Sequence, residues 1–526
     1  MTGDTAGRNV DDTLSADELE DRLFNDLREH MESMIAWGRG ESALAMEHAP
    51  LEEHALAEGY KAIRLFTEAH MKVRAARERR RTDVVDADGR TRVTIETGQD
   101  HTRTMLFGPV RTQRMAYRRY HAENLYPQDA QLNWAVLHSY SAGVVKRVAS
   151  TVALLPYGPT AHQITTTLPI KIGRRQVEQL AIATASDFEA FYAARRPEAR
   201  HDGVGLLITA DGSGLPMRPE ALRPATAKAA ADRAAGSGGW PDDPSQLRKS
   251  TKRSAELVCV ADIPPVVRTA EDILAALFPN TDKPPAGQGR TRHGPTAEGK
   301  TLFASVKHPI KAVVADGLVE AHRRDPEHAR PWYAIVDGNN TQIEAIRALA
   351  ETYQVQVPIL IDFIHVVQYL WKAANSLFYP KDPAGRDWVK AQAAKILAGR
   401  ARDVATGIRR RATRFGYSPK EREGADACAT YLDNKREFLD YPAFLAAGRP
   451  VASGLIEGAC RWLVKDRMEV AGARWGLDGA EAVLKLRALV GNGDFDDYFA
   501  YHLQQEKRRN HDSHYQQPEP ESEPQP

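Results

Sequence analysis

The sequence predicts an α/β core behind a mainly helical N-terminal region that carries a small β-hairpin part. Two short, continuously apolar runs end in an acid, at Trp332–Asp337 and Val357–Asp362, and a helical spacing of apolar residues separates them. Such runs are typical of parallel strands buried on both faces and joined by a helix. Residues 14–81 instead show helical spacing throughout. Parallel sheets place their chemistry at the carboxyl ends of strands, so Asp337 and Asp362 stand where a site is expected.

Composition narrows the class of protein. The 526 residues carry a net charge of +1, so overall charge favours no partner. The three cysteines stand far apart with no CxxC pair, which argues against a disulfide framework or a zinc site. No run approaches the roughly 20 apolar residues of a membrane helix, and the N-terminus lacks a signal-peptide core. We therefore expect a cytoplasmic protein with no membrane partner.

The first region, residues 1–130, is expected to begin with disorder at 1–13 and to continue as helices to residue 81. Two β-hairpin segments follow, with turns at Gly98 and Gly108. A basic run at the end of the helices includes Arg79 and Arg80. Such a run is either a solvated helix face or a patch that contacts phosphates.

Residues 131–200 are predicted to form three helices with short joints. The third begins with Arg174 and Arg175. Helix-turn-helix proteins present such residues at the start of the recognition helix, which suggests DNA binding. The alternative is that the three helices are only a packing unit.

The core is expected to open at residues 201–380. A buried strand, Val204–Ala210, ends in Asp211, and Gly212–Gly214 is expected to turn the chain so that Leu215–Arg218 returns as an antiparallel hairpin. Glu256–Asp262 reads as a further strand. Between and after these strands we expect an insertion at 219–252 with a loose loop at 236–239, a loop at 281–300 and a helix at 306–323.

The remaining chain is expected to be helical. Residues 381–450 form a basic insertion that includes Arg410, and residues 451–502 complete the core with a helix that carries Glu457. Arg461 and Lys465 follow Glu457 at i+4 and i+8 on one helical face, where they would track phosphates or form an ordinary solvated ion-pair ladder. The polar tail, 503–526, is expected to be disordered.

The order of strands and helices is that of a ribonuclease-H-like fold with a helical insertion. In that fold Asp211 and Asp337 are neighbours, and a later helix adds Glu457. Converging carboxylates need cations, and two Mg²⁺ ions, which Mn²⁺ can replace, suit oxygen ligands and phosphodiester chemistry. Each acid also has a structural interpretation: Asp211 and Asp337 as turn formers, and Glu457 as a surface residue. Asp362 competes with Asp337 as second acid; otherwise it caps a helix, and His365 is a core residue.

The chain resembles the DDE transposases of the ISKra insertion-sequence family, which are related to Mutator-like transposases with a (C/D)xxH motif. The matching stretches are Thr209–Arg218, Arg323–His328, Ala334–Asn339, Ile361–Lys372 and Gly454–Arg461. The resemblance implies a metal-binding triad of Asp211, Asp337 and Glu457, with Asp362 and His365 as the (C/D)xxH pair. Relatives often carry a cysteine-bearing module near residue 120, and this chain has none there.

The resemblance further implies a nucleoid-associated bacterial transposase. Such an enzyme binds the inverted repeats of its element and the target DNA, and works as a dimer or larger assembly. Two alternatives remain: a catalytically silent, transposase-derived DNA-binding regulator, and a ribonuclease-H-like nuclease without strand transfer. Retention of all three acids favours catalysis over the first, whereas the second shares every acid.

Overall fold

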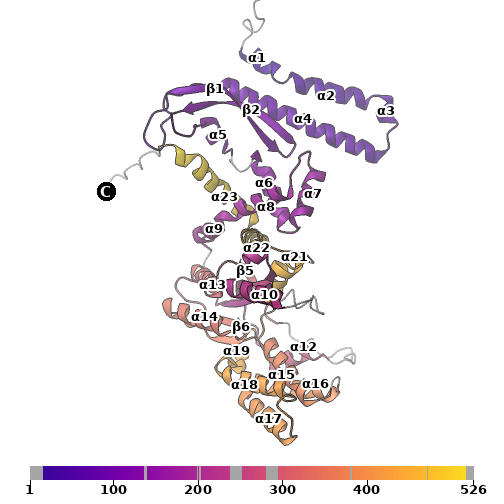
Figure 1. The fold of residues 1–526 in the computed structure, drawn as a ribbon, viewed down its shortest axis with the longest axis vertical. Coiled ribbons are helices and arrows are strands. Elements are labelled where there is room, and N and C mark those ends of the chain that lie inside the picture. The colour runs from indigo at the N-terminus through magenta and orange to yellow at the C-terminus, as the bar shows by residue number, and fades with distance from the viewer. Residues whose placement is uncertain are drawn as a thin grey trace, which may run out of the picture. The chain divides into compact units, whose positions relative to one another are not determined.

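The chain forms two compact units (Figure 1). Unit 1 contains residues 1–193 and 494–526, and unit 2 contains residues 194–493. The computed structural model describes residues 16–134, 139–197, 200, 203–236, 251–279, 294–379, 382–470 and 472–516. The predicted disorder at 1–13 and the loose loop at 237–239 lie outside the described residues. No helix in these ranges is both long and apolar enough to cross a membrane.

Unit 1 opens with helices and one β-hairpin. The helices are α1 (Ala16–Arg22), α2 (Asn25–Gly38), α3 (Glu41–Leu44) and α4 (His48–Arg77). Strands β1 (Thr94–Met105) and β2 (Gly108–Arg118) pair antiparallel. The predicted turn at Gly98 is wrong, because this residue (φ +70°) lies within β1 where the register shifts between Glu96 and Gln99. A bulge, like a turn, favours a glycine in the left-handed region.

A group of short helices completes unit 1. Three of them, α6, α7 and α8, pack together, and the joint before α8 ends at Gly173. The third predicted helix is not continuous, because a 3-10 turn at Ala185–Asp187 divides it into α8 and α9. The predicted disorder of the tail is wrong for residues 503–510, which form the end of α23. Buried Tyr498, His502 and Glu506 anchor this polar helix. The bounds are α5 (Pro127–Leu132), α6 (Ala142–Val152), α7 (Tyr157–Thr167), α8 (Arg174–Thr184), α9 (Phe188–Ala194) and α23 (Phe495–Asn510).

Unit 2 is built on a five-stranded mixed sheet of order β5-β4-β3-β6-β7. Strand β4 pairs antiparallel with both β3 and β5, whereas β6 runs parallel to β3 and β7 runs parallel to β6. The predicted strand–helix–strand unit is confirmed, with α14 (Asn340–Thr352) between β6 and β7. The strands are β3 (Gly205–Pro216), β4 (Lys252–Ile263), β5 (Glu298–Ser305), β6 (Trp332–Val336) and β7 (Ile359–Ile361).

The predicted hairpin at Gly212–Gly214 is wrong, because these residues lie within strand β3. It continues through both glycines to Pro216 and pairs with β4 along its whole length. A Cβ on Gly212 would lie 2.9 Å from the Ser254 hydroxyl, and one on Gly214 would lie 3.0 Å from Lys252 Cδ. These glycines therefore serve close approach of the side chains of β4 rather than a turn.

Helices cover the sheet of unit 2. α13 (Ile310–Arg324) packs on β4, where a Cβ on Gly317 would lie 2.5 Å from Val258 Cγ2. Strand β5 was not predicted from the sequence, and its first residues, 298–300, fall in the stretch that was predicted as a loop, 281–300. The other helices are α10 (Pro224–Gly236), α12 (Ala270–Leu277), α15 (Phe363–Leu377), α20 (Gly454–Cys460), α21 (Asp466–Met468) and α22 (Leu477–Asn492). The insertion is helical, as predicted: α16 (Pro383–Leu397), α17 (Ala401–Arg414), α18 (Glu423–Asn434) and α19 (Tyr441–Ala446).

Candidate active site

Asp211 and Asp337 occupy equivalent positions on two adjacent parallel strands. The last register pair of β3 and β6 is Ala210 with Val336, and each acid follows directly. Both side chains are half-buried. Asp362 follows β7, which is one strand further from β3. The expectation that the strand of Asp337 lies nearer to the first strand than that of Asp362 is therefore confirmed.

Both acids also bond to nearby backbone, but only Asp337 makes the bond expected of a turn former, because Asp211 lies within β3. Asp211 Oδ1 accepts a hydrogen bond of 2.7 Å from Gly212 N, and Asp337 Oδ1 accepts one of 2.8 Å from Asn339 N. Gly338, with φ +97°, makes the turn after β6. These bonds fix the orientation of each carboxylate.

Helix α20 brings Glu457 toward the same strands. At the start of the helix, the Ser453 hydroxyl donates to the Thr209 hydroxyl on β3 (2.9 Å). At its end, Cys460 Sγ donates to Asp211 Oδ2 (3.4 Å). Burial, followed by the Asp211 carboxylate, raises the pKa of the Cys460 thiol, so the thiol remains protonated as the donor. Glu457 itself is exposed, on a helix anchored at both ends to β3.

Asp362 is buried and fully engaged with backbone groups. One carboxylate oxygen accepts from Ile364 N and caps α15, and the other accepts from Ser453 N, both at 2.7 Å. Burial raises the pKa of Asp362, and the charge of Glu457 adds to this rise. The two backbone hydrogen bonds and nearby His365 oppose it. Asp362 therefore positions the start of α20, and the half-buried His365 imidazole lies near it.

Glu256 on β4 is a further acid near this strand end that the sequence did not single out. It pairs with Gly212, so it shares a face of the sheet with Gly212 rather than with Asp211. Burial raises the pKa of Glu256, and the charges of Asp211 and Asp337 add to this rise. A hydrogen bond from Ser254 and the charge of Arg223 oppose it. Only the register of β3 with β4 reveals this proximity, and register cannot be read from one strand alone.

The insertion holds the ends of β6 and β7. The Tyr431 hydroxyl of α18 donates to the Asp337 carbonyl (3.1 Å), and the Tyr441 hydroxyl of α19 donates to the Ile361 carbonyl (2.9 Å). Lys435 bonds to Asn340. Burial lowers the pKa of Lys435, and the negative charge of Asp337 partly opposes this change. The insertion therefore supports the loops that follow both strands.

The carboxylates have the donor chemistry that a hard divalent cation requires. Asp211, Asp337 and Glu457 offer only oxygen ligands, and all three are at least partly accessible. Across the part of the chain that the structure describes, no three His, Cys, Asp or Glu side chains stand close enough to form a preformed metal group. The residues thus fit Mg²⁺ by type, and the two-ion site stays a prediction.

The three basic residues of unit 2 that the sequence singled out are exposed, but not all are arranged as predicted. Arg461 and Lys465 are exposed, but residues 461–465 form a π-helical turn between α20 and α21. The single α-helical face with Glu457 is therefore wrong, because a π turn holds more residues. Arg410 is exposed on α17.

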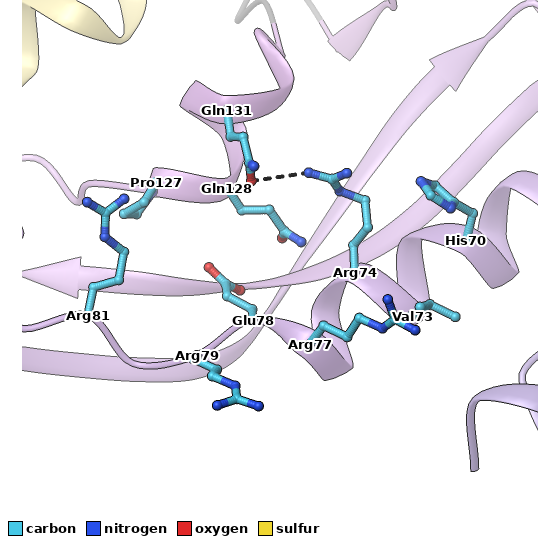
Figure 2. Close-up of a pocket in the computed structure, with 10 residues that line it drawn as sticks. All are labelled: His70, Val73, Arg74, Arg77, Glu78, Arg79, Arg81, Pro127, Gln128 and Gln131. Carbon is cyan, nitrogen blue, oxygen red and sulfur yellow. Dashed lines mark hydrogen bonds between the residues drawn. The ribbon is translucent and has the colours of Figure 1, made fainter. Parts of the chain in front are cut away.

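Unit 1 holds a basic cavity of about 550 Å³ at the end of α4 (Figure 2). Arg74 reaches Gln131 Oε1 at 3.2 Å, but its buried Nε has no hydrogen-bond partner. Arg79 is exposed on the rim, and the neighbouring Arg80 donates to the Val93 carbonyl instead (3.3 Å). Arg174 and Arg175 lie elsewhere in unit 1, exposed on the first turn of α8. The cavity lining is His70, Val73, Arg74, Arg77, Glu78, Arg79, Arg81, Pro127, Gln128 and Gln131.

No protein-family model matches the chain, and no curated protein matches it.

Proposed function

We propose that this chain is a DDE-type DNA transposase, which binds the inverted repeats of an insertion sequence and catalyses metal-dependent cleavage and strand transfer. The observation that carries the proposal is the equivalent position of Asp211 and Asp337 on two adjacent parallel strands, beside a helix that carries Glu457 and is bonded to the first of these strands. Asp211 and Asp337 follow the last register pair of β3 and β6, and α20, which carries Glu457, is bonded to β3 at Thr209 and Asp211.

The topology supports the same proposal. An antiparallel β3-β4-β5 meander followed by β6 and β7, parallel on the other side of β3, is the arrangement expected of a ribonuclease-H-like fold. On this proposal Asp211, Asp337 and Glu457 hold Mg²⁺, or Mn²⁺ in its place. When bound, such ions stabilise the attacking and leaving oxygens of a phosphodiester displacement.

The other residues take supporting roles. Asp362 holds Ser453 and thereby the start of α20, so it positions Glu457. His365 lies near Asp362 and would orient DNA near the cut. Arg174 and Arg175 on α8 would contact bases or phosphates of the repeat, and the cavity beside Arg79 would contact its backbone. Hydrolysis adds water across a P–O3′ bond, and the released 3′-hydroxyl then displaces the corresponding oxygen of the target.

The test is strand cleavage and joining by the purified chain with Mg²⁺ on a labelled duplex that carries the DNA flanking its gene. Asp337→Asn should lower cleavage by about 10²–10³-fold, the usual scale for losing one charge-stabilising group. Asp362→Asn should retain part of the activity, because Asp362 binds backbone groups rather than substrate.

Other outcomes would change the assignment. If Asp362→Asn abolishes cleavage and Asp337→Asn does not, the second acid is Asp362. Cleavage without joining would indicate a nuclease. Tight binding to the element ends without cleavage under any metal would indicate a DNA-binding regulator.

A further inference from the structure

The cavity at the end of α4 has the size of a small-molecule site and a polar lining (Figure 2). Its volume of about 550 Å³ falls within the range of about 300–1,000 Å³ that such sites occupy. Three stretches line it: the last turns of α4, the segment that follows at residues 78–81, and the first turn of α5. All three belong to unit 1, so the cavity lies within one compact unit.

Two of the four arginines in this lining are already neutralised. Arg77 donates to both carboxylate oxygens of Glu20, each at 2.6 Å, and Arg81 donates to both oxygens of Asp83, at 3.0 and 2.8 Å. Such bidentate pairs occupy the donors that would otherwise bind an anion. The positive charge that remains for a ligand therefore comes from the other two arginines.

Arg74 and Arg79 have no acidic partner among the described residues. Arg74 donates to the neutral side chain of Gln131 (3.2 Å), and its Nε is buried without a hydrogen bond. The Arg79 side chain is exposed at the rim and forms no hydrogen bond within the described part of the chain. Guanidinium groups bind phosphates strongly through their N–H donors. An anion in the cavity would therefore find one cation in its wall and another at its rim.

Gln128 is a buried polar residue whose amide lacks a partner. It exposes 6% of its surface, and the amide forms no hydrogen bond with any residue that the structure describes. Figure 2 shows the side chain in the space that Arg74 and Glu78 border. Because buried polar groups are nearly always hydrogen-bonded in folded proteins, each exception needs an explanation. A ligand inside the cavity would supply the missing acceptor and donor.

Glu78 is the one acid in the described lining, and it limits which anions fit. Its Oε2 accepts a hydrogen bond of 2.8 Å from Met115 N on β2. Burial raises the pKa of Glu78, and this bond and the charge of Arg114 oppose the rise. The carboxylate repels a bare anion, but it can accept further hydrogen bonds from a ligand that also carries a donor.

We propose that this cavity binds a nucleotide unit that ends in a phosphate. Arg74, Gln128 and Arg79 bind the phosphate, and a sugar hydroxyl or a base N–H donates to Glu78. A nucleotide carries both features on one small molecule. The phosphate must be terminal because Gln128 is buried: a phosphate within a duplex is joined to the strand on two sides and stays at the surface.

The same chemistry has two sources, a free nucleotide and the 5′-phosphorylated end of a DNA strand. Only the second source rests on the proposed function. Both differ from a contact with the duplex backbone, which would use the exposed Arg79 and leave the amide of Gln128 without a partner.

The first experiment is calorimetric titration of the full chain with the 5′-monophosphates of adenosine, guanosine, cytidine and thymidine, and with the nucleosides themselves. At least one monophosphate should bind, and its nucleoside should bind at least about tenfold more weakly, the scale of one hydrogen bond to a charged group. Gln128→Leu and Arg74→Gln should each weaken the monophosphate by a similar factor. Arg39→Gln is the matched control, because Arg39 is exposed in unit 1 and does not line the cavity.

Failure of all four monophosphates to bind, in the absence of any preference for a phosphorylated DNA end, would overturn the proposal. So would a nucleoside that binds as tightly as its monophosphate, because the phosphate would then not be recognised. Equal affinities of wild type, Gln128→Leu and Arg74→Gln would place the ligand elsewhere.

Thermal unfolding separates lost binding from misfolding. Leucine is close to glutamine in size and removes an amide without a protein partner, so Gln128→Leu should melt no lower than the wild type. The monophosphate should raise the melting temperature of the wild type and of Arg39→Gln, but not that of Gln128→Leu or Arg74→Gln. Equal stabilisation of all four proteins would contradict the proposed site.

Two duplexes that differ only in a 5′-phosphate or a 5′-hydroxyl distinguish the sources. Their affinities are measured without a divalent metal, so that no cleavage intervenes. A preference of about tenfold for the phosphorylated duplex that is lost in Gln128→Leu assigns the site to a DNA end. Binding of a monophosphate without such a preference assigns it to a free nucleotide. Because neither measurement depends on cleavage or joining, the site and the proposed function can fail separately.

Discussion

Asp362 binds two backbone N–H groups from segments far apart in sequence. One belongs to the first turn of α15 and the other to Ser453, 91 residues later. A carboxylate can accept both bonds, but an amide has only one oxygen and would direct its NH₂ group at one of the two donors. Asp362 therefore connects the end of β7 to the starts of α15 and α20 through hydrogen bonds.

We predict that Asp362→Asn lowers the free energy of unfolding of unit 2 by about 1–3 kcal/mol, the cost of leaving a buried donor without a partner. Urea unfolding followed by circular dichroism measures this change. Asp382→Asn is the matched control, because Asp382 also caps a helix but is exposed. If both substitutions have the same effect, the bond to Ser453 contributes nothing beyond the helix cap.

Asp187 is a second buried acid whose environment makes a pH prediction. Burial opposes its charge, but hydrogen bonds from Arg509 and His502 outweigh this and lower its pKa from 3.8 to about 2. Because the pKa in the folded state is lower, the stabilisation is complete above the ordinary pKa and is lost as pH falls toward 2.

We therefore expect Asp187→Asn to destabilise unit 1 by about 2 kcal/mol at neutral pH. The difference from wild type should narrow as the pH falls from 4 toward 2. Thermal unfolding at a series of pH values checks this prediction. A difference that stays constant over this range would mean that the carboxylate charge is not responsible.

At the scale of elements, two helical glycines have opposite roles. Gly317 lies where α13 crosses β4, and a Cβ there would overlap Val258. Gly407 lies on the exposed side of α17, where a Cβ would meet nothing within 4 Å. The first allows close packing, whereas the second only weakens its helix.

Gly317→Ala should lower the free energy of unfolding by about 1–3 kcal/mol through overpacking. Gly407→Ala should raise it by about 0.5–1 kcal/mol, because alanine favours the helix. Chemical denaturation of the two variants beside the wild type is the measurement. A stabilised Gly317→Ala variant would show that α13 and β4 do not pack this closely.

The sequence predicts those elements whose own apolar pattern is enough to identify them as strand or helix. β6 and β7 are continuous apolar runs, so their strand character and parallel pairing follow from sequence. Gly212 and Gly214 misled the prediction, because a glycine needed for close approach looks the same as one that forms a turn. The position of Glu256 near Asp211 depends on the register of two strands, which one strand alone does not reveal. Helix α23 is held by a contact between His502 and Asp187, about 300 residues earlier in the chain, so local sequence could not predict it.

At the scale of the whole molecule, the chain leaves unit 1 after residue 193 and returns to it at residue 494. The exit and return points are adjacent, since the Tyr192 hydroxyl donates to Asp494 at 2.9 Å. Unit 2 is thus an uninterrupted stretch of sequence inserted into a unit made of two stretches.

We predict that residues 194–493 unfold cooperatively as an isolated fragment. Residues 16–193 alone should melt at a lower temperature than residues 16–193 joined to 494–516 by a short Gly/Ser linker, because only the latter restores the partners of Asp187. Calorimetry of the three fragments tests this. Identical melting temperatures for the last two would show that α23 does not stabilise unit 1.

The return of the chain at residue 494 also sets an order of events during translation. The ribosome has supplied every residue of unit 2 before it adds the stretch that contains α23. Domains generally fold as units once their chain has emerged. The nascent protein therefore carries a complete unit 2 while unit 1 still lacks a helix, so the unit that begins first in the gene is the second to mature.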